Sequence, residues 1–506
     1  MIKSDNNLIR AVSFNARNEI ADKEFFDMLS QQGIEQYDPR LVPVRQILNS
    51  LKTDKSGVRK IDQKTLTRLL GEKRLLQQTI RKQQIIPDFS GFTATLDHIF
   101  NHVKKVRGGE VANYIPQLAS VAPDLYALSI CTIDGQVYSL GDHTTKFSLQ
   151  STNKPINYAL ALEELGEETV HRHVGKEPSG VSFNALTLNA RGLPHNPLIN
   201  AGAIMCSSLI QRQMAAAEKF DFILDVWQKL NGIDRPTFNN SMYLSEKSSA
   251  DRNFALAYFM RENGAFPPNT NVEKVLDFYF QCCAIESNTD MLARAAATFA
   301  NSGVNPFTNE KVLAPETVKK CLSMMHSCGM YDYSGEFSFR IGLPAKSGVS
   351  GAIWMVIPNL MGIAIYSPGL DECGNSLRGI KVAEELVSHF NFHHYDSLKV
   401  ENAQKQDPRR KKYETKVNAV MSLVFAASAG DLDEMRRLHA VGVDLNESDY
   451  DGRTALHLAA AENQTEAVKY LLKNGAHRDP VDRWGATPLD DAKRARHKDI
   501  IALLEK

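Results

Sequence analysis

The spacing of apolar residues predicts helices in the first part of the chain. Within residues 60–82, leucines recur three or four positions apart among Lys, Arg and Gln, at Leu66, Leu69, Leu70 and Leu75 or Leu76. This spacing places them on one face of a helix. We therefore predict a helical domain over residues 1–85.

A loop inside this domain imitates a calcium site. In Lys52-Thr-Asp54-Lys-Ser56-Gly57, the glycine could serve as the turn residue of such a loop. That register places Lys52 at the first ligand position and Gln63 at the twelfth, where calcium needs carboxylates. We predict an EF-hand-like helix pair that binds no metal.

The pattern becomes mixed over residues 86–397. Helical spacing in Lys154–Leu165 and Asp251–Glu262 alternates with short apolar runs of strand type, such as Leu125–Ile133 and Ala352–Ile357. Both kinds of element over this length predict one large α/β or α+β domain.

The most apolar stretch of the chain is Ala352–Tyr366, which Pro358-Asn359 divides into two runs. Each run has the length of a strand and falls short of the roughly 20 residues that a membrane helix needs. We predict an antiparallel hairpin here and no membrane segment. Residues 1–20 lack the apolar core of a signal peptide, so we expect a soluble protein that stays inside the cell.

The last part of the chain repeats itself. Leu423-x-x-Ala426-Ala427 returns as Leu456-x-x-Ala459-Ala460, at an offset of 33 residues. The segment Asp451–Ala460 closely matches the ankyrin repeat, whose helix pairs stack on their neighbours. We predict two full repeats and a shortened third over 416–506, able to bind a protein partner, after a basic linker over 398–415.

Charge and cysteine content exclude several classes of function. Lys plus Arg and Asp plus Glu number 59 each, so the formal net charge is zero. A protein that binds nucleic acid or an anionic membrane normally carries a basic excess. The 7 cysteines include no CxxC pair, which excludes a disulfide scaffold and a Cys-rich zinc module. An odd number of cysteines fits free thiols in a reducing compartment.

One candidate for catalysis is Ser151-Thr-Asn-Lys154, an S-x-x-K motif at the start of a predicted helix. Three residues make nearly one helical turn, so the hydroxyl and the amine lie on the same face. A neutral lysine could take the serine proton, if its pKa falls by about 2–3 units. A serine N-cap with a lysine one turn later is also a common helix opening, and the tetrapeptide alone leaves both interpretations open.

A second motif favours the catalytic interpretation. Lys346-Ser-Gly348-Val349 precedes the predicted hairpin. An S-x-x-K motif followed by K-[ST]-G on a strand is the signature of serine-acylating β-lactamases and penicillin-binding proteins. The same four letters at Lys55–Val58 stand in a charged turn, and we treat that copy as chance. The backbone N–H groups of Val349 and Ser151 would together form an oxyanion hole.

Longer segments of the chain are familiar as well. They are Val111–Ala119, Cys131–Gly135, Val174–Gly180, Pro194–Pro197, Asn200–Ala203, Asp251–Phe254, Met325–Tyr331 and Gly342–Val349. These segments resemble the serine-dependent glutaminases, and most of all the long animal kidney and liver type with its helical front domain and ankyrin tail. The resemblance implies an α+β, β-lactamase-like catalytic domain. It also implies hydrolysis of L-glutamine to L-glutamate and ammonia.

The resemblance implies roles for individual residues as well. Ser151 resembles the family nucleophile, Lys154 its activating partner, and Tyr331 the residue that passes a proton to the departing ammonia. The residues similar to the family's substrate shell are Tyr114, Asn200, Glu246, Asn253 and Tyr279, with the Val349 amide as oxyanion donor. Carboxylate, amide and phenol groups suit a substrate that carries both an α-ammonium and an α-carboxylate.

Two departures from the animal relatives concern regulation and location. The loop 182–195 has Leu186-Thr187-Leu188 where the relatives carry an aromatic-containing segment, so activation by inorganic phosphate stays open. We expect no cofactor. A transit peptide is missing before Met1, so we expect a bacterial cytoplasmic enzyme, or a mitochondrial matrix enzyme if such a peptide was removed. The family likeness implies a homotetramer, with longer assemblies as a further expectation.

Two other functions remain as alternatives. A β-lactamase or D-alanyl peptidase would use the same motifs, but it would need an export signal. An ankyrin scaffold with an inactive enzyme domain is the other alternative. This second alternative is disfavoured, because an inactive domain has no physical need to retain Ser151, Lys154, Tyr331 and the Lys346-Ser-Gly motif together.

Overall fold

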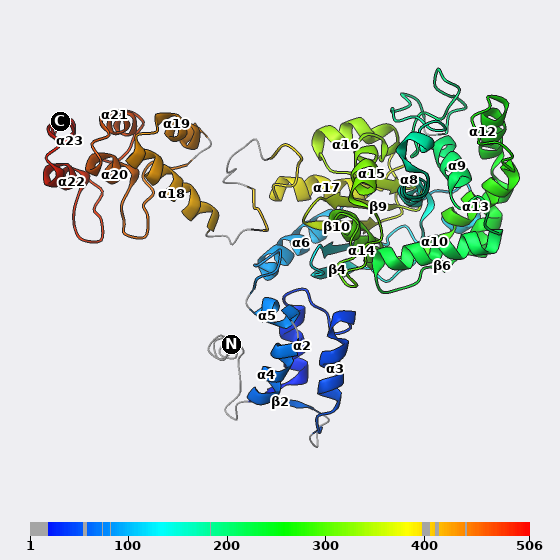
Figure 1. Ribbon diagram of the computed structural model, residues 1–506, viewed down its shortest axis with the longest axis horizontal. Helices are drawn as coiled ribbons and strands as arrows, with labels where there is room; N and C mark the ends of the chain where they lie inside the picture. Colours follow the sequence, from blue (N-terminus) through cyan, green and yellow to red (C-terminus); the bar gives the residue numbers. More distant parts are fainter. Residues whose placement is uncertain are drawn as a thin grey trace. The chain divides into compact units, whose positions relative to one another are not determined.

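The computed structural model describes residues 19–53, 58–72, 74–80, 82–182, 184–396, 405–409, 414–440 and 443–505. The chain divides into two compact units (Figure 1). The first runs up to Val387 and includes Phe392–His394, and the second comprises Ser388–Asn391 and the chain from Tyr395 on. In the described part, no helix combines the length and the apolar character that crossing a bilayer requires.

Short helices form the front of the first unit, as the leucine spacing predicts. They are α2 (Asp22–Ser30), η1 (Pro39–Leu41), α3 (Val42–Asn49), α4 (Gln63–Glu72) and α5 (Arg74–Ile80). Their buried faces meet in one core that includes Phe25, Leu48 and Leu66. Residues 54–57 of the calcium-like loop lie outside the described residues, so the EF-hand-like, metal-free pair stays a prediction.

The predicted helix over residues 60–82 is wrong at its first residues. Lys60–Asp62 forms strand β2, which pairs antiparallel with β1 (Glu19–Ala21). Ile61 lies opposite Ile20 in this ladder, and both side chains are buried. Pairing with a distant segment overrides the local helical spacing, so the helix begins only at Gln63.

A five-stranded antiparallel sheet lies in the first unit, with the strand order β4-β3-β10-β9-β8. The strands are β3 (Ala127–Thr132), β4 (Val137–Gly141), β8 (Ala345–Gly348), β9 (Ala352–Ile357) and β10 (Met361–Tyr366). β9 and β10 form the predicted hairpin, with Ile357 opposite Met361. Asn359 takes a φ of 59° in its turn, a conformation that asparagine tolerates better than most residues.

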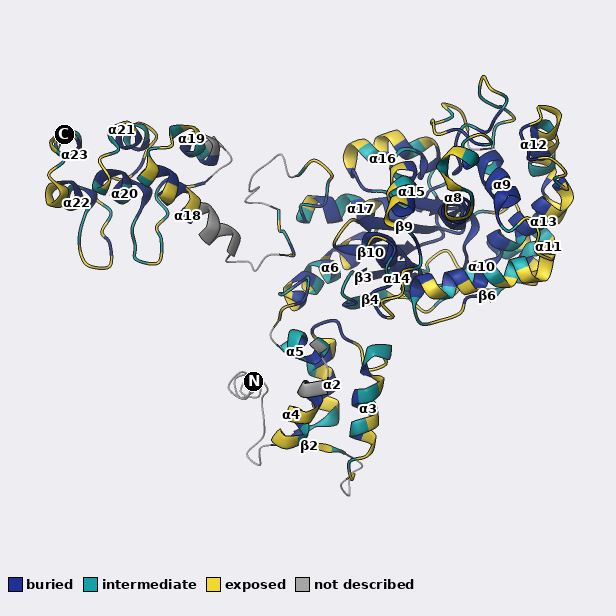
Figure 2. Cartoon of the chain, viewed as in Figure 1, coloured by how far each residue is buried: buried dark blue, intermediate teal, exposed yellow. Residues whose placement is uncertain are grey.

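Helices cover both faces of this sheet, whose strands β3, β9 and β10 are buried along their length (Figure 2). Ile353 and Trp354 are neighbours on β9 and therefore point to opposite faces. The Trp354 ring packs against Phe299 of α14 (Thr289–Ala300), with the ring centroids 5.3 Å apart. On the other face, a Cβ on Gly379 of α17 (Leu377–His389) would lie 2.8 Å from Ile353 Cδ1. The result is a helix–sheet–helix arrangement of the predicted α+β class.

The other helices of the first unit include the two that the sequence predicts in this region. These helices are α6 (Phe89–Val103), α7 (Pro116–Ala119), α8 (Lys154–Val170), α9 (Asn200–Leu209), α10 (Ala216–Asn231), α11 (Asn240–Ser248), α12 (Asp251–Glu262), α13 (Val272–Cys283), α15 (Pro315–Cys328) and α16 (Ser334–Arg340). The predicted Asp251–Glu262 is α12 itself, and α8 extends five residues beyond the predicted Lys154–Leu165. A small sheet of order β5-β7-β6 joins β5 (Phe147–Ser148), β7 (Ile285–Ser287) and β6 (Thr237–Phe238).

The front helices contact the outer edge of the sheet. The Arg40 guanidinium pairs with Asp38 and donates to two backbone oxygens of the β3–β4 turn, Asp134 O at 2.6 Å and Gly135 O at 2.9 Å. The first N–H of β4, on Val137, donates to Gly33 O at 2.8 Å. These helices and the sheet belong to one compact unit, and the domain boundary at residue 85 stays a prediction.

The second unit consists of helix pairs with the predicted 33-residue period. Its helices are α18 (Glu414–Ala429), α19 (Leu432–Ala440), α20 (Ala455–Ala461), α21 (Thr465–Lys473), α22 (Pro488–Ala495) and α23 (Lys498–Leu504). The first residues of α19, α21 and α23 lie 33 residues apart. In the predicted linker, Gln406 forms a parallel bridge with Phe390, so that part of the segment is structured rather than only solvated.

Candidate active site

Ser151 lies in a single 3-10 turn directly before a helix, so it stands at the helix start that its motif predicts. The turn is η2 (Gln150–Asn153), and α8 begins at Lys154. Two indole groups hold this turn: Trp354 Nε1 donates to Thr152 O at 3.2 Å, and Trp227 Nε1 donates to Asn153 Oδ1 at 2.8 Å. Fixed donors on two separate elements keep the serine in one position.

The residue before the serine has a strained backbone. Gln150 has a φ of 48°, a region that costs an L-residue of its kind about 1 kcal/mol or more. Such strain persists only where the surroundings impose it, and here Gln150 Nε2 donates to Glu246 Oε1 at 2.9 Å. The strained residue is therefore hydrogen-bonded to Glu246, a predicted substrate-binding residue.

Lys154 is buried at the start of α8, with 2% of its surface exposed. Its amine donates to Asn200 Oδ1 at 2.6 Å, and Asn200 Nδ2 in turn donates to Asn253 Oδ1 at 3.1 Å. Burial lowers the pKa of Lys154 to about 8. A substantial fraction of the amine is therefore neutral near physiological pH, which agrees with the fall in pKa that a proton acceptor needs.

Tyr331 interacts with Ser151 from a segment that is distant in the sequence. It opens η3 (Tyr331–Tyr333), between α15 and α16, with a φ of 52°. Burial raises the pKa of its phenol, whereas the nearby Ser151 side chain and Val349 backbone lower it. Burial is the larger effect, so the phenol stays protonated at neutral pH and can donate a proton.

The Lys346-Ser-Gly motif lies on edge strand β8, against the serine turn. A Cβ on Gly348 would stand 3.0 Å from Thr152 Cγ2 and 3.1 Å from Leu149 O. A larger residue would therefore push the strand away from the turn, which explains the glycine in the motif. Val349 follows directly, is half-buried, and has its backbone beside the Tyr331 phenol.

Glu246 and Tyr114 form the other side of the site. Tyr114 OH donates to Glu246 Oε1 at 2.7 Å, the same oxygen that Gln150 reaches. Burial raises the pKa of the Glu246 carboxyl, and these two hydrogen bonds oppose the rise. Glu246 is 7% exposed on α11, whereas Tyr114 is 49% exposed and stands at the protein surface.

Cys283 is a central residue that the sequence did not single out for this site. It ends α13, is buried, and interacts with the Tyr279 hydroxyl, which brings the predicted Tyr279 to the others. Its thiol lies close enough to Lys154 and Glu246 for their charges to shift its pKa, which burial raises. The adjacent cysteines Cys282 and Cys283 stand out in the sequence. Only contacts between distant segments reveal which of the two lies at the site.

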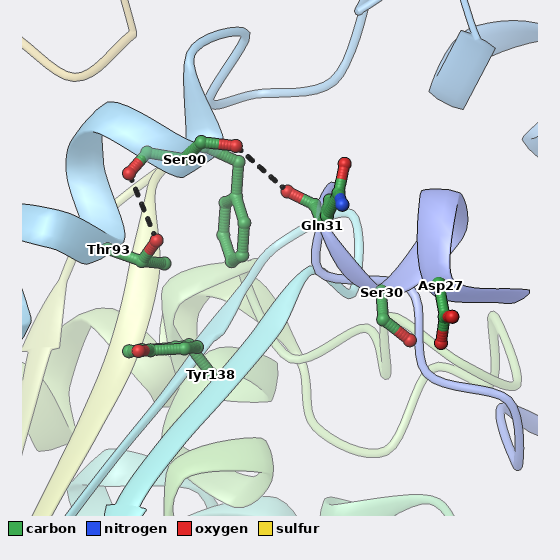
Figure 3. Close-up of a pocket in the computed structure, with 7 residues that line it drawn as sticks. Asp27, Ser30, Gln31, Ser90, Thr93 and Tyr138 are labelled. Atoms are coloured by element: carbon green, nitrogen blue, oxygen red, sulfur yellow. Dashed lines mark hydrogen bonds between the residues drawn. The ribbon is translucent and has the colours of Figure 1, made fainter. Parts of the chain in front are cut away.

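A separate hollow of about 520 Å³ lies between α2, the start of α6 and β4 (Figure 3). Within it, Ser90 Oγ donates to Gln31 O at 3.4 Å. Its lining residues are Asp27, Ser30, Gln31, Phe89, Ser90, Thr93 and Tyr138. None of the nine predicted site residues lines it. In the part of the chain that the structure describes, no group of His, Cys, Asp and Glu side chains is arranged to hold a metal ion.

Comparison with known proteins identifies the family. Residues 109–395, which contain all nine predicted site residues, match the glutaminase family model. The chain belongs to the glutaminase family. Residues 423–506 match a model of three ankyrin repeats. The chain is thus an amidohydrolase that acts on glutamine, with the predicted β-lactamase-like catalytic domain, and the β-lactamase and D-alanyl peptidase alternatives are not supported.

Several glutaminases are similar over most of their length. The rat "Glutaminase liver isoform, mitochondrial" is 45% identical over 95% of this chain and 80% of its own. The Caenorhabditis elegans "Putative glutaminase 3" is 45% identical over 95% of this chain and 84% of its own. A Nostoc glutaminase is 44% identical over 61% of this chain and 92% of its own, so it corresponds to the catalytic part without the ankyrin tail.

Solved glutaminase structures share the fold of the catalytic part. The probable glutaminase YbaS has a TM-score of 0.55 and 38% identity, over 58% of this chain and 94% of its own. A Bacillus subtilis probable glutaminase complexed with 6-diazo-5-oxo-L-norleucine has a TM-score of 0.52 and 31% identity, over 60% of this chain and 94% of its own.

Proposed function

We propose that Ser151 is the nucleophile of this glutaminase domain. The observation that carries the proposal is the convergence on its turn of a buried amine with a lowered pKa, a protonated phenol and a backbone N–H. Each of these groups comes from a different segment: Lys154 from α8, Tyr331 from η3 and Val349 from the end of β8.

The first step is acylation. Ser151 Oγ attacks the side-chain amide carbon of glutamine, its proton passes to the neutral Lys154 amine, and a C–O bond forms. The Val349 and Ser151 N–H groups stabilise the oxyanion that develops. The C–N bond then breaks, and the Tyr331 phenol supplies a proton so that the nitrogen leaves as ammonia. The proton held by Lys154 then passes to the Tyr331 phenolate, which restores both groups. In the second step water attacks the ester carbon and gives a proton to the Lys154 amine. The C–O bond to Ser151 then breaks, L-glutamate leaves, and the proton passes from Lys154 to the serine oxygen.

The substrate's α-amino acid group is bound by the remaining residues. The Glu246 carboxylate, held by Tyr114 and Gln150, pairs with the α-ammonium. The amides of Asn200 and Asn253 and the Tyr279 phenol supply hydrogen bonds to the other polar atoms. Tyr114 stands at the surface and is thus suited to meet the substrate first.

Substitution of the serine tests this proposal. Ser151→Ala should abolish ammonia release from L-glutamine while circular dichroism and the melting temperature stay close to those of the wild type. Ser148→Ala is the matched control, because Ser148 is also buried and lies three residues upstream in β5. Wild-type turnover by Ser151→Ala would refute the nucleophile assignment.

We further propose the assembly, regulation and location that the relatives suggest. The protein is a homotetramer, able to form longer assemblies, and its ankyrin unit binds a protein partner. Inorganic phosphate is the candidate activator, and no cofactor takes part. The names of the rat and mouse relatives favour the mitochondrial matrix over the bacterial cytoplasm. Light scattering tests the proposed assembly, and assays with and without phosphate test the proposed activation.

A further inference from the structure

Lys346 is a buried lysine whose side chain the mechanism above does not use. It lies on β8 and has no exposed surface. Its amine donates to Gly329 O at 3.0 Å and to Ser347 O at 2.7 Å, and it stands 4.5 Å above the centre of the Tyr331 ring. Its contacts are thus carbonyl oxygens and an aromatic face.

These contacts hold the amine in one place. Two of its N–H groups reach carbonyl oxygens, and the ring of Tyr331 covers another side of the nitrogen. Burial and the nearby charge of Lys154 lower the pKa of Lys346. Burying a lysine amine costs free energy unless the amine is hydrogen-bonded, and here two carbonyl oxygens accept from it.

The contacts of Lys346 converge on the segment that carries Tyr331. Gly329 directly follows α15 and lies two residues before the tyrosine. Gly329 O also accepts from Ser347 N at 3.1 Å, so β8 binds the end of α15 through one main-chain and one side-chain donor. A Cβ on Gly329 would lie 1.8 Å from Ala345 O, which shows how closely the helix end and the strand approach.

Tyr331 needs such support, because its φ of 52° is unfavourable for an aromatic residue. Ser334 Oγ accepts from Met330 N at 2.9 Å and donates to Tyr331 O at 2.7 Å. Asn375 Nδ2 donates to Met330 O at 3.3 Å. These bonds fix the backbone on either side of the tyrosine, whereas Lys346 contacts the ring that carries the reacting hydroxyl.

We propose that Lys346 is a positioning residue that holds the Tyr331 phenol against Ser151. The inference rests on the proposed roles of Ser151 and Tyr331. Lys346 acts through the tyrosine: its side chain packs against one face of the ring, and its amine holds the preceding turn through a hydrogen bond to Gly329 O. A displacement of a catalytic group by about 1 Å lowers turnover by about 100-fold, and we expect an effect of that size on kcat.

The test is a double-mutant cycle with Lys346→Met and Tyr331→Phe in the full-length protein. Lys346→Met removes the amine and its hydrogen bonds and keeps an unbranched side chain of similar length. We expect kcat to fall by about 100-fold with KM changed by less than about threefold, because the residue does not contact substrate. In the double variant, kcat should fall little beyond that of Tyr331→Phe, since both changes remove the same function.

The control is Lys219→Met. Lys219 is also a lysine that donates to a backbone oxygen, Ser207 O at 2.8 Å, and that lies over an aromatic ring, Phe278 at 4.1 Å. We expect its loss to leave kcat nearly unchanged. If Lys346→Met does not fold, as judged by circular dichroism, Lys346→Gln replaces it in the cycle, because the shorter side chain retains an N–H donor but no charge.

Each outcome separates this inference from the proposed function. Effects of Lys346 and Tyr331 that multiply independently would overturn the positioning role, as would normal kcat in the lysine variant beside a defective Tyr331→Phe. Full activity of both Ser151→Ala and Tyr331→Phe would instead overturn the proposed function, whatever the lysine variant does.

Discussion

The buried amine of Lys154 shows how one residue can be prepared for proton transfer without a carboxylate partner. Its hydrogen-bond acceptor is a neutral amide, Asn200 Oδ1, so desolvation is not offset by an opposite charge. Desolvation therefore dominates and brings the pKa to about 8. An Asp or Glu in place of Asn200 would raise this pKa again and keep the amine protonated.

A pH dependence of the rate follows from this shift. The neutral, proton-accepting form of Lys154 becomes more populated as the pH rises through about 8. We expect kcat/KM to increase roughly tenfold per pH unit on the acid side of that value and to level off above it. The measurement is ammonia release between pH 6 and 9.5. A flat profile across this range would show that Lys154 does not accept the proton.

Ser151, Lys154 and Val349 could be named from their motifs and the other six site residues from the resemblance, but the connections between them could not. Nothing in the order of residues indicates that Gln150 shares an oxygen of Glu246 with Tyr114, or that Cys283 meets Tyr279. These contacts join segments that are far apart in the sequence. Likewise, the positive φ at Gln150 and Tyr331 is imposed by the surrounding structure, so local preference gives no sign of it.

Among the elements, the turn that carries Ser151 depends on two larger neighbours. α10 contributes Trp227 and β9 contributes Trp354, and each gives its indole N–H to the turn. The sheet and the helical part of the domain thus meet at the Ser151 turn. Movement of either element relative to the other would displace the serine.

Trp354→Phe is expected to weaken this support. The change leaves Thr152 O without its donor inside the protein, which costs about 1–3 kcal/mol of folding free energy, and it lowers kcat because the turn is less well fixed. Chemical denaturation and steady-state assays measure the two effects. The matched control is Trp484→Phe, since Trp484 is 64% exposed in the ankyrin unit. Equal kcat values for both variants would contradict the role of the indole.

Elements with a strong local pattern were the ones that sequence could place. The apolar run of β9 and the helix α12 have their predicted bounds, and the Pro358-Asn359 break correctly marks the hairpin. Strand β2 was missed because Ile61 pairs with Ile20 of a distant strand. The local pattern therefore predicts many helices and strands, and the exceptions arise where pairing with a distant segment overrides that pattern.

At the scale of the whole molecule, catalysis and the ankyrin repeats reside in different compact units. Every predicted site residue belongs to the first unit. The Nostoc relative covers 61% of this chain with 92% of its own length, so a glutaminase can consist of little more than the corresponding region. The ankyrin unit is therefore not required to build the site.

Removal of the chain after Asp396 should therefore leave catalysis intact. We expect kcat of the truncated protein to remain within about threefold of the full-length value, with assembly or partner binding changed instead. Ammonia release and light scattering measure these two properties. Loss of activity in a truncated protein that retains its circular dichroism spectrum would show that the second unit supports the site.

The contact between the front helices and β4 has a consequence for solubility. A sheet edge with free N–H and C=O groups can recruit a strand from another molecule, and proteins block such edges to avoid aggregation. Gly33 O binds Val137 N on this edge, and Arg40 occupies the oxygens of the adjoining turn. A protease that removed the segment before residue 85 would leave every catalytic group in place. It would nevertheless expose the edge of β4, to which a strand of another molecule could pair. The first effect of removing the segment would therefore be precipitation of the protein.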